Sequence, residues 1–214
     1  MPQVMPTTAT APRTLLELSN ATPQAASLTD AVVVVIDAQR EYVDGLLPLE
    51  GVRDALREIE AVLSRARQNA APIVHVRHHG ASGGAFDPNG AGFTFAPGAE
   101  PLVAEPQAME SIVNKTLPDA FADTDLNDIL QGFGRKKLLV MGFMTHMCIS
   151  STVRAALAHG YFSTVVARAT ATRALPGAEG NEISATMLQQ TSLAALADRF
   201  AVVIEDASAL TDQP

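Results

Sequence analysis

The chain has 214 residues, of which 47% are hydrophobic and 18% charged, with a formal net charge of −8 and a pI near 5.0. These values predict one domain with a sizeable core and argue against a nucleic-acid surface, so a small-molecule substrate is expected. With no apolar run near the roughly 20 residues that span a bilayer, no signal-like start and one cysteine, we expect no membrane contact and a cytoplasmic protein.

Residues 1–27 are rich in Pro, Thr, Ala, Gln and Ser and differ from the rest of the chain. We expect an N-terminal arm there, either disordered or packed on a neighbouring subunit. Residues 28–214 are expected to form the single folded domain.

Short β-branched apolar runs alternate with longer amphipathic stretches after this arm. The expected strands are 32–36, 73–76, 138–141, 164–166 and 202–204, and the expected helices are 52–67, 149–159 and 183–196. Strands that are apolar on both faces are typical of a parallel sheet covered by helices on both sides. The pattern predicts a three-layer α/β/α domain with a mostly parallel sheet of about six strands. Sites in such sheets lie beyond the carboxyl ends of the strands.

One stretch, residues 78–101, is rich in Gly and Pro and interrupts the alternation of strands and helices. Long loops inside compact domains are usually functional or disordered. Its aromatic residues Phe86, Phe93 and Phe95 are expected to form an apolar wall or lid over a site, and Phe86 and Phe95 are candidates for substrate contact.

Two charged residues follow apolar runs directly. Asp37 comes after 32–36, and Lys115 ends the run that begins at Ile112. Either residue has a simpler interpretation, because aspartate often caps a turn and a lone lysine is usually solvated. Their shared position at strand ends nevertheless makes both candidates for a site.

The single cysteine, Cys148, lies where the run 138–141 passes through Gly142 into a polar turn before the expected helix. At a helix N-terminus, free N–H groups and the helix dipole would favour a thiolate and an adjacent oxyanion. A buried structural thiol is the alternative, since free cysteine is among the most buried residue types.

Together these residues resemble the catalytic triad of the isochorismatase-like cysteine hydrolases, which include nicotinamidases and N-carbamoylsarcosine amidohydrolase. The matching segments occur in the same order and cover nearly everything after residue 30; they are VVVVIDAQ at 32–39, IVHV at 73–76, NKTLPDAF at 114–121, GFMTHMC at 142–148 and the stretch 152–161. The resemblance implies the isochorismatase-like, Rossmann-like hydrolase fold.

The same resemblance implies the roles of the residues. Asp37 would be the general base, Cys148 the nucleophile, and Lys115 the group that orients them and balances charge. The backbone N–H groups of Met144 and Cys148 would form the oxyanion hole, next to a cis peptide at Phe143-Met144. The implied reaction is hydrolysis of an amide, carbamoyl or lactam C–N bond of a small molecule through a thioester-type intermediate.

Other residues near these motifs are weaker candidates. Gln39 could hydrogen-bond a substrate amide and Tyr42 could line the pocket, with a structural hydrogen bond and core packing as the alternatives. His146 is expected to support the nucleophile turn or an interface rather than act as a base, while Thr145 should brace that turn. Arg173 could rim the site or an interface.

We expect no metal and no cofactor. Nicotinamidases carry an Asp-x-His element with further histidines after the second strand, whereas this chain has only His78 and His79 there, and adjacent side chains on extended backbone point apart. The family resemblance also implies a homo-oligomer, a dimer or larger.

Two other functions remain open. One is an isochorismatase, which splits a vinyl ether by proton transfer from the aspartate and needs no thiol. The other is a binding or thiol redox protein that keeps the fold without turnover.

Overall fold

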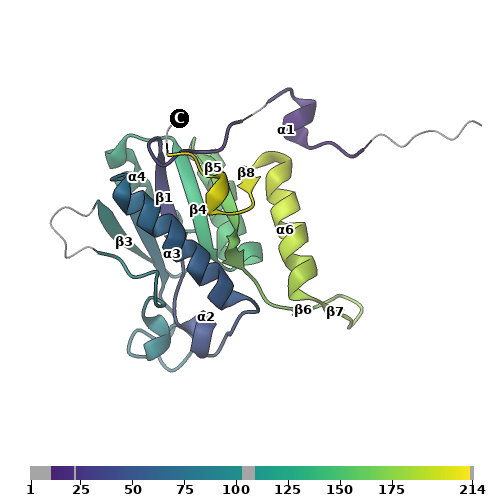
Figure 1. The fold of residues 1–214 in the computed structure, drawn as a ribbon. Coiled ribbons are helices and arrows are strands. Elements are labelled where there is room, and N and C mark those ends of the chain that lie inside the picture. The colour runs from purple at the N-terminus through teal and green to yellow at the C-terminus, as the bar shows by residue number, and fades with distance from the viewer. Residues whose placement is uncertain (1–10, 22, 103–108, 213–214) are drawn as a thin grey trace, which may run out of the picture.

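A single sheet of six parallel strands organises the molecule (Figure 1). The computed structural model describes residues 11–21, 23–102 and 109–212. The strand order is β3-β2-β1-β4-β5-β8, which confirms the predicted mostly parallel sheet. The strands are β1 (Ala31–Ile36), β2 (Ile73–His78), β3 (Glu110–Lys115), β4 (Lys137–Phe143), β5 (Phe162–Ala171) and β8 (Ala201–Ile204).

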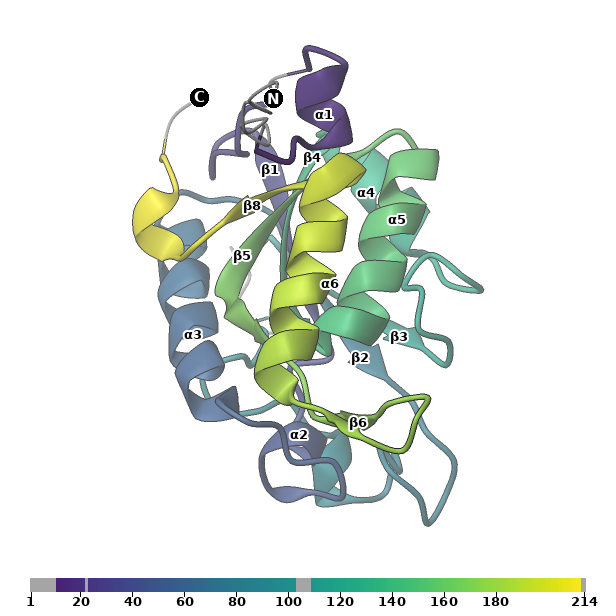
Figure 2. The same ribbon diagram turned by 90° about the vertical axis from the view of Figure 1, so that its right-hand side faces the viewer.

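Helices cover both faces of this sheet, as the apolar strands require (Figure 2). On one face lies α3 (Val52–Gln68); on the other lie α4 (Leu126–Phe133), α5 (Ser150–Ala158) and α6 (Ala185–Arg199). Strand β1 is buried along its whole length, with Val33 and Val35 packed in the core beneath α3 and its alternate residues in the opposite core. Burial on both faces explains why β1 is a continuous apolar run.

Several elements differ from the expected boundaries. Helix α4 was not predicted, because only Leu126 and Leu130 are buried on it and so short a pattern gives little periodicity. The helix expected from residue 183 begins at Ala185, since Ser184 caps it by accepting a hydrogen bond from the Met187 N–H. The residues before that cap pair in a small antiparallel hairpin, β6 (Leu175–Pro176) with β7 (Glu182–Ile183).

The described part of the N-terminal arm packs on the chain's own helices. Its short helix α1 (Leu15–Leu18) lies beside α6, where the Leu15 N–H donates to Asp198 at 2.8 Å. Further along, the Ala26 N–H donates to the Thr164 hydroxyl on β5 at 2.8 Å. Residues 1–10 of the predicted arm lie outside the described residues.

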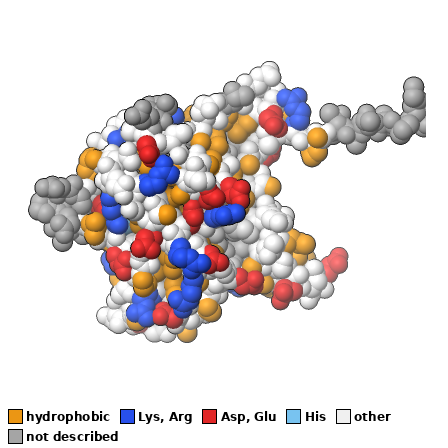
Figure 3. All heavy atoms as spheres, viewed as in Figure 1, with side chains coloured by type: hydrophobic (Ala, Val, Ile, Leu, Met, Phe, Trp, Pro, Cys, Tyr) orange, Lys and Arg blue, Asp and Glu red, His pale blue; other side chains and the backbone are white. Residues whose placement is uncertain are grey.

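Within the described residues, no helix has the length and apolar character needed to cross a membrane. Over α3, acidic and basic side chains lie together on the surface (Figure 3).

Strands β1 and β4 leave no room for a side chain at Gly142, near the end of β4. Gly142 pairs with Ile36 of β1, has a φ of +116°, and a Cβ built on it would lie 2.0 Å from the Ile36 carbonyl oxygen. A glycine is therefore needed where β1 and β4 carry their chains toward the same edge of the sheet.

We predict that Gly142→Ala lowers the free energy of unfolding by roughly 1–3 kcal/mol or more, because the added methyl overpacks a rigid backbone contact at a positive φ. Denaturant unfolding measures this change. The matched control is Gly132→Ala in α4, where nothing lies within 4 Å of the added Cβ. That variant should be neutral or more stable, and equal losses for the two would contradict the steric argument.

Candidate active site

The parallel register brings Asp37 and Lys115 to the same edge of the sheet, which lies at the bottom of Figure 1 near α2 (Glu41–Asp44). Asp37 directly follows β1, and its N–H donates to the Val76 carbonyl of β2 at 2.9 Å. Lys115 is the last residue of β3 and is in register with His78, the last residue of β2. The strand between them therefore sets their separation.

Asp37, Lys115 and Cys148 meet there as a buried trio. The Lys115 Nζ lies 2.7 Å from Asp37 Oδ2 and 3.3 Å from Cys148 Sγ. The side chains of Asp37 and Lys115 are fully buried, and Cys148 is 5% exposed. The contact between Lys115 and Asp37 is an ion pair by distance.

Burial and charge together decide where the protons of this trio reside. Removal from water raises the pKa of the Asp37 carboxyl, and the Lys115 ammonium opposes that rise. Burial and the Asp37 charge raise the pKa of the Cys148 thiol to about 12, again opposed by Lys115. Two unit charges about 4 Å apart interact by roughly 4 kcal/mol at an effective dielectric constant near 20, so the groups titrate as one coupled system. At neutral pH the sulfur keeps its proton until a base removes it.

The turn that carries Cys148 differs from the predicted strand-to-helix junction. The peptide between Phe143 and Met144 is cis, at the position that the family resemblance implies. A π-helical turn, η2 (Thr145–Ile149), then precedes α5, and the Met144 carbonyl accepts from the N–H groups of Met147 and Ile149. Because this turn is continuous with α5 and begins after Met144, Cys148 lies in the first turn of the helical segment. The raised pKa of its thiol favours the neutral form there over the expected thiolate.

Thr145 and His146 brace this turn against the end of β5. The buried Thr145 hydroxyl donates to the Ala171 carbonyl at 3.1 Å, as predicted for a bracing residue. The His146 Nδ1 is hydrogen-bonded to the Thr172 hydroxyl, and burial, with a smaller effect of Arg173, lowers the pKa of His146. Neither side chain has a hydrogen bond to the trio.

Gln39 lies at the same edge, and its side-chain amide is hydrogen-bonded to backbone groups of the protein. Its side-chain NH₂ donates to the carbonyls of His78 and Phe93, both at 3.0 Å, and its oxygen accepts from the His78 N–H at 2.8 Å. Because the amide spends its donors and an acceptor on backbone, the structure makes Gln39 the link between β2 and the long loop. These contacts favour the structural hydrogen bond that was the alternative for Gln39.

The aromatic residues divide between two faces of β2. Tyr42 is 2% exposed and packs edge-on against Phe86 and Phe143. The ring centroid of Phe86 also lies 5.0 Å from that of His78. The Asp37 charge adds to burial in raising the pKa of the Tyr42 phenol, which places the phenol near the trio.

Phe95 lies elsewhere. Its ring packs on His75 at 5.6 Å and beneath Arg77 at 5.5 Å. Those two residues alternate with His78 along β2 and so occupy its opposite face. The predicted substrate contact by Phe95 is therefore not supported.

The sequence did not indicate His78 as part of this site. Its Nδ1 lies 3.2 Å from the Lys115 Nζ, whereas the neighbouring His79 packs on Phe93. The signal that could have found it is the position of His78 at the end of a central strand, directly before the loop. Among the described residues, no group of three or more potential metal ligands gathers in one place.

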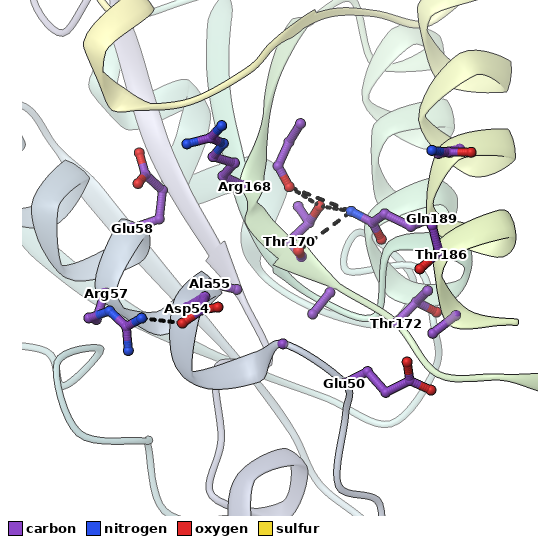
Figure 4. A pocket seen from close by; sticks show the side chains of 15 residues that line it. Glu50, Asp54, Ala55, Arg57, Glu58, Arg168, Thr170, Thr172, Thr186 and Gln189 are labelled. Carbon is purple, nitrogen blue, oxygen red and sulfur yellow. Dashed lines mark hydrogen bonds and ion pairs between the residues drawn. The ribbon is translucent and has the colours of Figure 1, made fainter.

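A polar groove of about 800 Å³ lies apart from the trio, between α3 and α6 (Figure 4). Gln189 of α6 crosses its floor and donates to the Thr170 hydroxyl at 2.8 Å. Two of its lining residues, Ala171 and Thr172, are the partners of Thr145 and His146. The groove is thus connected to the nucleophile turn through backbone and hydroxyl contacts, without containing the trio.

The comparisons with known proteins agree on one family. The Isochorismatase domain model matches residues 31–208. The crystal structure of an isochorismatase from Pseudomonas putida is 41% identical, with a TM-score of 0.88, and the match covers 94% of this chain and 100% of that one. The chain therefore belongs to the isochorismatase family of hydrolases, and the predicted family and fold are confirmed.

Two further proteins are similar to this chain over most of its length. The secreted isochorismatase effector Isc1 of Verticillium dahliae is 35% identical over 85% of this chain and 91% of its own length. A streptothricin hydrolase of Streptomyces noursei is 33% identical over 85% of this chain and 71% of its own length.

We predict that His146→Ala leaves the rate of Cys148 alkylation by iodoacetamide within a few-fold of the wild type, because His146 contacts Thr172 and not the trio. Mass spectrometry over time measures this rate. Loss of alkylation in a folded His146→Ala protein would make His146 the base.

Thr145→Val should lower the free energy of unfolding by roughly 1–3 kcal/mol, because it removes the hydroxyl that donates to the buried Ala171 carbonyl.

Proposed function

We propose that this protein is a cysteine-dependent hydrolase that cleaves a non-peptide C–N bond of a small amide, carbamoyl compound or lactam. The observation that carries the proposal is the buried trio, in which one lysine ammonium contacts both a carboxylate and the only sulfhydryl of the chain. A purely structural thiol has no need of a buried ion pair, whose desolvation is costly.

The first half of the reaction follows from the proton positions. The Cys148 sulfur attacks the carbonyl carbon, and its proton moves to the Asp37 carboxylate as the S–C bond forms. The tetrahedral intermediate then expels the nitrogen, which takes the proton back from Asp37 and leaves as an amine or ammonia. Lys115 stays charged throughout and offsets the negative charge that moves between Asp37 and the substrate.

The second half returns the enzyme to its resting state. Water attacks the thioester, Asp37 accepts a proton from it, and the C–S bond breaks with the proton returning to Cys148. Both halves pass through an oxyanion, for which we propose the backbone N–H groups of Met144 and Cys148 as donors. The Met144 carbonyl accepts hydrogen bonds from the Met147 and Ile149 N–H groups, which supports this assignment because they fix the orientation of the turn.

Tyr42 and Phe86 are proposed as the apolar wall of the substrate pocket, since Phe86 packs on Tyr42 and on the ring of His78, which contacts Lys115. The relative named streptothricin hydrolase supports hydrolysis of a small molecule.

A second candidate is the hydrolysis of a vinyl ether, as in an isochorismatase. It is favoured by the names of the Pseudomonas putida structure and of the Verticillium dahliae relative. That reaction requires only a proton donor such as Asp37, so the cysteine would be dispensable. Pyruvate release from isochorismate, measured before and after alkylation of the thiol, separates the two reactions.

We predict that Cys148→Ala abolishes amide turnover. Cys148→Ser should retain only a small fraction of the wild-type rate, because a serine hydroxyl is a weaker nucleophile in the same position. Intact-protein mass spectrometry during incubation with a panel of amides, carbamoyl compounds and lactams should trap an acyl mass on the wild-type chain. Unchanged hydrolysis by the Ala variant sinks the proposal. Inactivity across the panel, with a thiol no more reactive than free cysteine, would favour a binding or redox protein.

A further inference from the structure

The end of β2 supplies a fourth side chain to the buried trio. His78 and Lys115 are paired residues on neighbouring parallel strands, so their side chains leave the same face of the sheet. We propose that His78 is a positioning residue, whose neutral imidazole accepts a hydrogen bond from the Lys115 ammonium and holds it between Asp37 and Cys148. This inference rests on the proposed function, since it concerns how the same lysine acts.

The Lys115 ammonium has three polar partners, and His78 is one of them. An ammonium has three N–H groups and no acceptor, and the partners here are Asp37 Oδ2 at 2.7 Å, Cys148 Sγ at 3.3 Å and His78 Nδ1 at 3.2 Å. Contacts to all three partners hold the buried ammonium beside the Cys148 sulfur. Without the imidazole, the fully buried Lys115 side chain would lose one of these three partners.

The contact also fixes the protonation of the imidazole. A lysine ammonium can only donate, so Nδ1 must carry the lone pair and Nε2 the proton. The titratable groups that act on the His78 ring are Lys115, which contacts it, and the adjacent His79. Burial, then Lys115 and His79, lower the pKa of His78 to about 4, which keeps the ring neutral at pH 7.

The backbone of His78 is anchored independently of its ring. Both its N–H and its carbonyl are hydrogen-bonded to the Gln39 side chain, at 2.8 and 3.0 Å. The ring itself is packed edge-on against Phe86 at 5.0 Å. Replacing the side chain should therefore change the contact to Lys115 while leaving the strand end in place.

The neighbouring His79 provides a matched control. It is exposed, its ring packs on Phe93, and it adds only a more distant charge to the site. Substitution of either histidine removes one imidazole from the same strand end, so the difference between the two variants isolates the contact to Lys115.

The test compares His78→Leu, His78→Gln and His79→Leu by their rates of Cys148 alkylation with iodoacetamide across pH, which requires no substrate. We expect His78→Leu to react about tenfold more slowly at neutral pH or worse, as for loss of a hydrogen bond to a charged group. His78→Gln, which retains an acceptor oxygen, should recover part of the alkylation rate. Its pH–rate profile should also differ less from that of the wild type than the profile of His78→Leu does. His79→Leu should match the wild type.

Equal rates for folded His78→Leu and the wild type would overturn the inference. Should that variant fail to fold, nitrogen NMR of the wild-type histidines still decides, with the His78→Gln spectrum assigning the signal. We expect an unprotonated Nδ1 and a protonated Nε2 at pH 7, and an imidazolium or an Nδ1–H tautomer contradicts the proposal. Amide turnover by Cys148→Ala would refute the proposed function instead, so the two failures are distinguishable.

Discussion

The buried ion pair between Lys115 and Asp37 is the constraint on which the candidate site depends. A lysine ammonium that is 1% exposed is stable only if its charge and its N–H groups are matched, and the chain matches them with a carboxylate, a thiol and an imidazole. The Cys148 thiol is therefore one member of a coupled group. In the proposed mechanism, its chemistry is set by the carboxylate that takes its proton and by the cation that offsets the charge.

The parallel sheet supplies the precision that such a group needs. Asp37, His78 and Lys115 stand at the ends of three neighbouring strands, and their spacing is that of the backbone hydrogen bonds. On the other side of β1, the close approach at Gly142 brings β4 to the same edge, where its chain turns back and presents Cys148. Strands hold the charged groups, while the turn braced by Thr145 holds Cys148.

Much of this could be predicted from the sequence, because its signals are local. The run 32–36 is apolar on both faces, which indicates a central parallel strand, and the ordered motifs around Asp37, Lys115 and Cys148 carry the family resemblance. Side-chain contacts across strands are not local. The uses of Gln39 and His78 depend on register and on the path of the long loop, and Phe95 proved to face the opposite side of β2.

The most direct test of the coupled trio is the ultraviolet absorbance of the Cys148 thiolate as a function of pH, taken as the difference between the wild type and Cys148→Ala. Because burial and Asp37 raise the pKa of the thiol to about 12, the difference should show no thiolate at neutral pH. The signal should stay absent to about pH 9, above the ordinary titration of a free cysteine. A thiolate that titrates below pH 7 would contradict the account, because the sulfur would then be an independent anion with no need of Asp37 as its base.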